Sequence, residues 1–340
     1  MSNENTLSLR ERGRACPRMY LSGGEGGGVR VKLAGIDIGT NTLRLLIAEF
    51  SGDGIYRKVD SGRYITRLGE GLSGTGRLKD EAMERALRVL KGFADKCSEN
   101  DVDGIYAVAT SAVREAVNGR DFIQEVKNKT GIDVDIISGD EEARITMLGV
   151  YPGLEITCKD VLMMDIGGGS TEFMLVSKGE IIFTVSTDIG VVRFTEQYIK
   201  SDPPGEQELE LLGRVIEERL KKVVSKKGDL AGGVEFIGTA GTVTTLAAID
   251  QMMRIYDSEK INGYRIKRDG VMKILKMIRS MTNKERKELP GVEEGREDII
   301  LAGAMVVYKV MELFGFDEMT VSDAGLREGL VVDLYNRLKI

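Results

Sequence analysis

Two short segments decide how this sequence folds: DIGTNT at residues 37–42 and DIGGGST at residues 165–171. Each segment lies between two apolar runs, VKLAGI and LRLLIAEF in the first case, VLMM and EFMLVS in the second. A tight turn then follows, SGDG or KGE, and a third strand-like run returns the chain. The aspartates of the two units, Asp37 and Asp165, are 128 residues apart. A repeat of this kind predicts two related α/β domains, each opening with a β-hairpin.

The rest of the chain alternates between helical and strand-like patterns. Helices are expected at 80–97, 112–130, 140–150, 189–200, 206–226, 242–256, 269–281, 294–314 and 325–338, and strands at 105–110, 134–137, 234–238 and 319–322. Asp80 is expected to cap the first helix. This order predicts an α/β protein with domain I at 31–145 and domain II at 146–340, the terminal helix packing back on domain I.

Residues 1–30 differ in character from the remainder. Six glycines lie between Gly13 and Gly28, and the segment shows no hydrophobic period. We expect either a disordered tail or a misassigned start, because this composition cannot form a core.

Composition excludes several classes of chemistry. The 340 residues contain no histidine, which rules out Ser-His-Asp triads, histidine-ligated zinc and an imidazole base. The net charge of −6 argues against a nucleic-acid or membrane-surface binder. Three widely spaced cysteines predict neither a disulfide framework nor a zinc cluster, so a reducing cytoplasmic setting is expected. The longest apolar run, 299–308, is too short to span a membrane.

The glycine-rich turns are the candidate phosphate sites. Their backbone N–H groups can approach an anion closely, and hydroxyl side chains add donors. Neither turn has the P-loop pattern, and glycines that merely form tight hairpins are the alternative interpretation. A third segment, GTAGTVTT at 238–245, follows a strand and opens a helix, whose N-terminus would attract an anion. The candidate phosphate-binding residues are Asp37, Gly39, Thr40, Asn41, Gly167, Gly168, Gly169, Ser170 and Gly241.

Six segments in order carry a resemblance to a known family: DIGTNT, TSAVRE (110–115), ISGDEEAR (137–144), DIGGGSTE (165–172), GTAGT (238–242) and SDAGLREG (322–329). Together they resemble the exopolyphosphatase and guanosine pentaphosphate phosphohydrolase family, in its short two-domain form. This family lies within the actin-like ATPase superfamily. The resemblance implies two actin-like, ribonuclease H-like domains with a phosphate-binding cleft between them.

The resemblance also implies roles for individual residues. Glu142 takes the place of the residue that activates water, and Arg114 that of a phosphate-binding arginine. Asp165 and Glu172 are the implied ligands of Mg²⁺ or another divalent cation. On a helix Glu141 and Glu142 point about 100° apart, so only one of the two is expected to face a cleft. The helical pattern alone leaves Glu142 equally compatible with solvent.

The resemblance implies an exopolyphosphatase that releases terminal phosphate from inorganic polyphosphate. Hydrolysis of guanosine pentaphosphate to guanosine tetraphosphate is a second candidate activity, and a second copy of the chain is a candidate partner. The competing class is an ATP-dependent small-molecule kinase or another actin-like ATPase module. Arg57, Lys58, Arg63, Arg67 and Arg77 form either a basic track for a polyanion or a solvated face.

Overall fold

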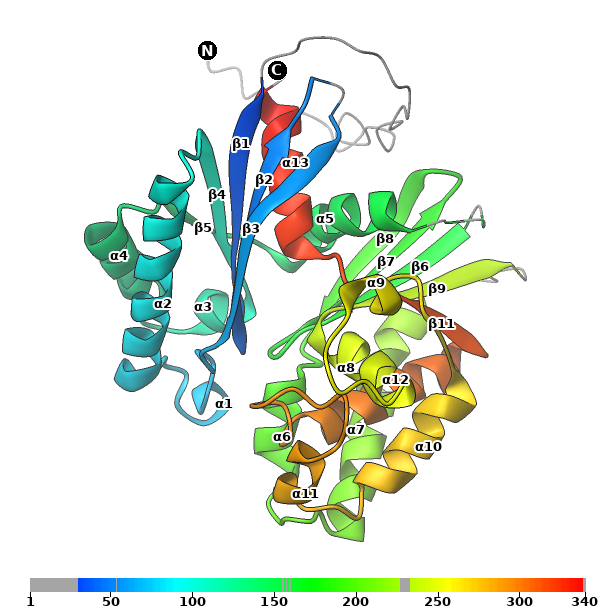
Figure 1. The fold of residues 1–340 in the computed structure, drawn as a ribbon. Coiled ribbons are helices and arrows are strands. Elements are labelled where there is room, and N and C mark those ends of the chain that lie inside the picture. The colour runs from blue at the N-terminus through cyan, green and yellow to red at the C-terminus, as the bar shows by residue number, and fades with distance from the viewer. Residues whose placement is uncertain are drawn as a thin grey trace, which may run out of the picture.

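The structure is a computed structural model that describes residues 30–338, apart from 53, 155, 157, 159 and 227–232. The expectation for the N-terminal segment lies outside the described residues, except at Arg30. The chain forms two α/β halves, with helices α5 and α13 lying between the two sheets (Figure 1).

The first half contains a five-stranded sheet in the order β3-β2-β1-β4-β5. Its strands are β1 (Val31–Ile38), β2 (Thr42–Phe50), β3 (Tyr56–Ile65), β4 (Gly104–Ala109) and β5 (Val134–Ile136). Strands β1, β2 and β3 pair antiparallel, whereas β4 and β5 continue the sheet in parallel with β1. Its helices are α1 (Leu72–Thr75), α2 (Asp80–Glu99), α3 (Ser111–Glu115), α4 (Gly119–Thr130) and α5 (Gly139–Val150), the last of which leads into the second half.

The second half repeats this plan with one added strand, in the order β8-β7-β6-β9-β11-β10. Its strands are β6 (Asp160–Ile166), β7 (Thr171–Ser177), β8 (Glu180–Thr187), β9 (Val234–Thr239), β10 (Arg265–Lys267) and β11 (Glu318–Val321). Its helices are α6 (Val191–Tyr198), α7 (Glu206–Val224), α8 (Gly241–Asp250), α9 (Ser258–Ile261), α10 (Arg268–Ile278), α11 (Asn283–Lys287), α12 (Ile300–Phe314) and α13 (Leu326–Leu338). The predicted repeat of two hairpin openings is confirmed, since β6, β7 and β8 pair as β1, β2 and β3 do.

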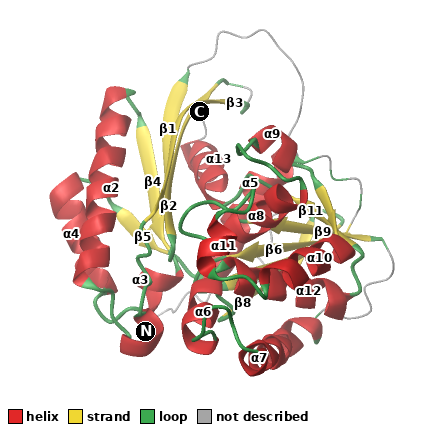
Figure 2. Cartoon of the chain, turned by 60° about the horizontal axis from the view of Figure 1, so that its bottom comes forward, coloured by secondary structure: helices red, strands yellow, loops and turns green. Residues whose placement is uncertain are grey.

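Alternating side chains along the first strands build a layered core. Ala34, Ile36 and Ile38 of β1 pack under α2 and α4, whereas Val31 and Leu33 face α13. In β6 the same alternation sends Leu162, Met164 and Ile166 toward the cluster of α7, α8 and α12, and Val161 and Met163 toward α5. Helices α13 and α5 therefore cover the inner faces of the two sheets and pack against each other between them (Figure 2).

Two glycines allow α5 and α13 to cross in backbone contact. A Cβ added at Gly149 would lie 2.2 Å from the carbonyl oxygen of Gly325, and one at Gly329 would lie 1.8 Å from that of Ile145. No larger residue fits either position without a shift of backbone. The boundary drawn between residues 145 and 146 falls within α5, and α13 packs on β1, β2 and β4.

Several expected boundaries differ from the observed ones. Lys79, not Asp80, is the N-cap of α2, and no side chain caps that helix. The helix expected at 112–130 is two helices, because Asn118 exchanges hydrogen bonds with the backbone of Leu78 between them. The helix expected from 242 ends at Asp250, and the one expected from 294 begins at Ile300. Within the described part of the chain, no helix has both the length and the apolar character that crossing a membrane requires.

Candidate functional site

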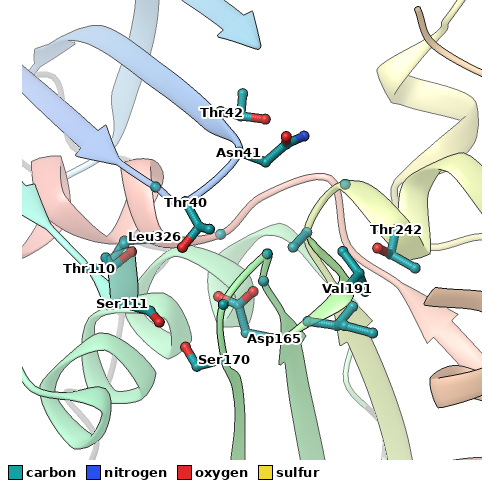
Figure 3. A pocket seen from close by; sticks show the side chains of 18 of the residues that line it. Thr40, Asn41, Thr42, Thr110, Ser111, Asp165, Ser170, Val191, Thr242 and Leu326 are labelled. Atoms are coloured by element: carbon teal, nitrogen blue, oxygen red, sulfur yellow. The ribbon is translucent and has the colours of Figure 1, made fainter. Parts of the chain in front are cut away.

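A cavity of about 80 Å³ lies between the two halves, where the hairpin turns meet. We call it the central cavity; it is lined by residues of both turns, of the α5 and α8 N-termini and of the segments before α12 and α13 (Figure 3). The β1–β2 turn contributes Thr40, Asn41 and Thr42, and the β6–β7 turn contributes Asp165 and Ser170. The fold thus brings the two sequence repeats to a single site.

The two turns have the same local geometry and touch each other. Gly39 N–H donates to the carbonyl of Thr42, and Gly167 N–H donates to that of Ser170, at 3.2 and 2.9 Å. A Cβ at Gly168 would lie 3.0 Å from Cβ of Thr40. The glycines of the second turn are therefore needed for close approach across the cleft as well as for the hairpin.

Two polar atoms at the cavity have no protein partner. Asn41 Nδ2 and Thr42 Oγ1 are buried and make no hydrogen bond to any described residue. Because a buried unpaired donor is costly, such atoms call for a bound ligand or water. Asn41 Nδ2 is a donor and Thr42 Oγ1 can donate as well, so an oxyanion suits both.

Three buried carboxylates line the same cavity, Asp37, Glu142 and Asp165, and a fourth, Glu172, is buried opposite Asp165 on the neighbouring strand. Burial raises the pKa of Asp37 to about 6 and that of Glu172 to about 8, the latter helped by the nearby Asp165. Burial also raises the pKa of Glu142 well above its usual value, and Glu172 and Asp165 add to the effect. The pKa of Asp165 rises for the same reason, although Arg44 and a 3.1 Å hydrogen bond from Thr146 oppose the rise. Burial of four carboxyl groups close together therefore disfavours their charged forms, which a bound cation would stabilise.

Helix α5 presents Glu142 to the central cavity and turns Glu141 away from it. Glu142 is buried, and Arg114 Nη1 donates to its Oε2 at 3.3 Å while also donating to the carbonyl of Ile137 at 2.8 Å. Glu141 instead accepts two hydrogen bonds from Arg144, at 2.8 and 2.9 Å, which lowers its pKa. Of the two neighbouring glutamates, Glu142 is the one that faces the cavity.

The sequence reasoning missed two arginines that line the central cavity, Arg44 and Arg296. Arg296 is buried, its Nε donates to Glu293, and its guanidinium lies against the start of α8. A Cβ at Gly241 would lie only 2.1 Å from Arg296 Nη2, so a side chain there would displace the guanidinium from its place against the helix. Ala240, just before it, has φ 74°, an uncommon conformation for a residue with a side chain. The helix N-terminus and the guanidinium together make this wall of the cavity positive.

A second cavity, of about 240 Å³, adjoins the first and shares Arg44 and Ala240 with it. We call it the arginine cavity, because Lys58, Arg63 and Arg327 join Arg44 in its lining. Burial, with Arg296 and Arg44 nearby, lowers the pKa of Arg63 to about 9. Tyr256, whose hydroxyl donates to Asp323, also lines this cavity.

The basic residues of domain I divide between two environments. Lys58 and Arg63 line the arginine cavity, whereas Arg57 pairs with Glu49, and Arg67 pairs across the cleft with Asp298 at 3.0 Å. Arg77 is exposed and lines neither cavity. Of the five residues, Lys58 and Arg63 line the arginine cavity, and Arg63 also pairs with Glu293 at 2.6 Å. The basic track stays a prediction.

The donor set fits a hydrated Mg²⁺ ion better than a protein-only metal cage. Within the described residues, no three His, Cys, Asp or Glu side chains converge on a metal position. Asp165 and Glu172 are direct cross-strand partners, so both project from one face of the β6–β7 pair. Mg²⁺ is commonly held by one or two carboxylates together with waters and substrate phosphates.

Most residues predicted for the site meet at the central cavity. Arg114 and Glu172 do not line it; Arg114 lies behind Glu142, and Glu172 is buried with only 1% exposure. The residues that line it are Asp37, Gly39, Thr40, Asn41, Glu142, Asp165, Gly167, Gly168, Gly169, Ser170 and Gly241. Their individual roles remain predictions.

Comparison with known proteins shows which family has this fold and sequence. The sequence profile of the Ppx/GppA phosphatase family matches residues 47–338. Exopolyphosphatase 2 of Mycobacterium tuberculosis is 34% identical over 316 residues, which cover 89% of this chain and 98% of that protein.

Solved structures agree with this match over nearly the whole chain. The Ppx/GppA family member of Aquifex aeolicus is 33% identical with a TM-score of 0.77, covering 91% of this chain and 99% of its own. An exopolyphosphatase from Cytophaga hutchinsonii is 30% identical with a TM-score of 0.84, covering 90% and 98%. The predicted two-domain fold is confirmed by these structures. From its turns, its cavity and these relatives, the chain belongs to the Ppx/GppA phosphatase family.

Proposed function

We propose that this chain is an exopolyphosphatase, which hydrolyses the terminal phosphoanhydride bond of inorganic polyphosphate. One observation carries the proposal: a small cavity with buried carboxylates and unpaired donors adjoins a larger cavity lined by four cations. The first suits a terminal phosphoryl group, and the second suits the negative chain behind it. The exopolyphosphatases among its relatives support the same assignment.

The terminal phosphate would be bound by the two turns and the start of α8. Backbone N–H groups of the glycine turns, Asn41 Nδ2 and Thr42 Oγ1 supply donors. Arg44 and Arg296 supply positive charge at the same cavity. In phosphoryl transfer most catalysis comes from such positioning and charge stabilisation.

Glu142 is the proposed general base. The oxygen of a water bonds to the terminal phosphorus, the bond from phosphorus to the bridging oxygen breaks, and the shortened chain keeps that oxygen. Glu142 accepts the proton of the water, and burial raises its pKa, which makes the carboxylate a stronger base. Arg114 is then a positioning residue, because it holds the Glu142 carboxylate through Oε2.

Asp165 and Glu172 are the residues proposed to hold a divalent cation, with Mg²⁺ the candidate. When bound, the ion would neutralise charge on the phosphate oxygens and on the carboxylate cluster. The raised pKa values of both carboxylates fit this role, since they are buried beside each other and a bound cation would favour their charged forms.

Guanosine pentaphosphate is a second proposed substrate. The aromatic ring of Tyr256 lines the arginine cavity beside Arg44 and Arg63, and an aromatic face next to cations suits a nucleoside attached to phosphates. A cytoplasmic setting is proposed with it, because Cys97 and Cys158 are free thiols. A homodimer is also proposed, and sedimentation of the purified chain would test it.

Phosphate release tests the proposal directly. We expect the purified chain with Mg²⁺ to release orthophosphate from long polyphosphate, and more slowly from guanosine pentaphosphate. A Glu142→Gln variant purified by the same procedure is the control for contaminating phosphatases, because a contaminant would remain active in it. Turnover of ATP without release of phosphate from polyphosphate would instead favour a kinase or ATPase.

A further inference from the structure

A third cavity lies behind the central cavity, on the side away from the arginine cavity. It has a volume of about 150 Å³ and is bounded by α1, α3 and α6, so we call it the rear cavity. It shares Thr40, Ser111, Gly168 and Gly169 with the central cavity but no residue with the arginine cavity. The three cavities therefore form a row, in which the central cavity is the middle member.

The partition between the central and rear cavities is thin. The same four residues face both spaces, and they are two glycines and two small hydroxyl residues. A Cβ at Gly169 would lie 2.4 Å from Ser111 Oγ and 2.9 Å from Thr40 Oγ1. No bulky side chain fills this wall, so opening it requires rotation of Thr40 and Ser111 together with a shift of the Gly168–Gly169 backbone.

The outer end of the rear cavity is polar, and its charged residues are one arginine, Arg193, and two glutamates, Glu115 and Glu196. Arg193 donates from Nε to the carbonyl of Gly169 at 3.1 Å and from Nη2 to Glu115. Glu196 accepts from Gly71 N–H at 2.8 Å and from Ser73 Oγ at 2.9 Å. One guanidinium can guide a phosphate past this point, and two carboxylates prevent its tight retention.

The arginine cavity at the other end gives a reason for a rear route. If the arginine cavity holds the polyphosphate chain, that chain closes the front of the central cavity during and after cleavage. The released orthophosphate then lies between the remaining chain and the thin wall. We propose that the rear cavity is the exit for orthophosphate, so that the shortened chain stays bound for the next cleavage. This inference rests on the proposed exopolyphosphatase function.

Ser73 offers a way to close the exit without touching the central cavity. It is exposed, lines the rear cavity and does not line the central one. In a Ser73→Cys variant, a bulky maleimide attached after folding would block the rear cavity. The unlabelled variant is the matched control, and wild-type protein treated with the same reagent controls for the native cysteines Cys16, Cys97 and Cys158. A Ser73→Trp and Ser73→Ala pair tests the same point without reagent.

Two phosphate signals are followed with long polyphosphate: total orthophosphate after acid quenching, and free orthophosphate with a fluorescent sensor. After labelling we expect a burst of total phosphate equal to the enzyme concentration, with no burst of free phosphate. The steady rate should fall about tenfold, which corresponds to about 1.4 kcal/mol of added release barrier. With tripolyphosphate the steady rate should be unchanged by labelling. The pyrophosphate that remains after cleavage leaves through the arginine cavity, and orthophosphate can then leave by the same way.

Three results would overturn the inference. If labelled and unlabelled protein run equally fast on long chains, with both signals rising together, orthophosphate does not leave by this route. If labelling slows long and short substrates alike, the label has disturbed the site instead of an exit. If wild-type protein releases no phosphate from polyphosphate, the proposed function itself fails and the exit fails with it.

Discussion

Arg44 occupies in the first hairpin the position that Glu172 occupies in the second. Arg44 lies directly across the strand pair from Asp37, and Glu172 lies directly across from Asp165. The repeat thus keeps its register and reverses the charge opposite the aspartate. One aspartate faces a cation of the protein, and the other faces a second carboxylate. The half with Arg44 is therefore suited to an anion, and the half with Glu172 to a metal ion.

Asp165→Asn should lower the affinity of the enzyme for Mg²⁺. The substitution removes one charge from the proposed cation site and keeps the size of the side chain. Activity should fall strongly at ordinary Mg²⁺, and excess Mg²⁺ should recover part of it. A Mg²⁺ titration of phosphate release measures the effect, with Asp37→Asn as the matched variant from the other hairpin. A titration midpoint equal to that of the wild type would remove Asp165 from the metal site.

Glu142→Gln should reduce turnover by about 10²–10⁴-fold, the usual contribution of a general base, with KM little changed. The amide can still accept from Arg114 but cannot accept the proton of water. Glu141→Gln is the control, since Glu141 pairs with Arg144 on the outer face of α5. Steady-state kinetics on both variants decide the point. Ordinary turnover in Glu142→Gln, or a larger loss in Glu141→Gln, would refute the assignment.

Lys58→Gln should weaken hydrolysis of long polyphosphate more than that of tripolyphosphate. Lys58 lines the arginine cavity, whereas its neighbour Arg57 on β3 pairs with Glu49 of β2 and does not line that cavity. Arg57→Gln is therefore a control of equal charge change on the same strand. Salt should weaken the long substrate more steeply than the short one in the wild type, and less so in Lys58→Gln. Equal effects of the two substitutions would mean that Lys58 is merely solvated.

The metal-free protein should become less stable as pH rises through the neutral range. The pKa of Glu172 is about 8 in the folded protein and near 4.5 when unfolded. Between these values the folded state holds a proton that the unfolded state has lost, so the free energy of unfolding falls with rising pH. Asp37 acts in the same direction up to about pH 6.

Thermal unfolding in a chelator between about pH 5 and pH 8 measures this slope. Saturating Mg²⁺ should reduce it, because a bound cation stabilises the charged carboxylates. Glu172→Gln should flatten it as well. A melting temperature that stays constant or rises across this range without metal would contradict the burial of a protonated Glu172.

The sequence predicts well what depends on local pattern. The two DIG turns predict both hairpins and their shared site, because a repeated strand–turn–strand pattern specifies backbone pairing. The sequence could not predict that Arg296 lines the cavity. Its position depends on a loop that folds back over Gly241, 55 positions earlier in the chain. Arg44 was visible only as one residue of a strand, and the 128-residue spacing could have revealed it as the counterpart of Glu172. The division between Lys58 and Arg57 likewise depends on tertiary packing, which charge patterns do not contain.

The crossing of α5 and α13 has a consequence for how the protein tolerates change. Gly149 and Gly329 bring the two helices into backbone contact. A single methyl group at either position would push the helices apart at the point where the two halves of the molecule meet. The sheets lie on either side of this point, and a small displacement grows along their length before it reaches the turns. Substitution at either glycine would therefore separate Thr40 from Gly168, far from the altered residue. The alignment of the proposed phosphate site therefore depends on glycine at two positions that lie outside it.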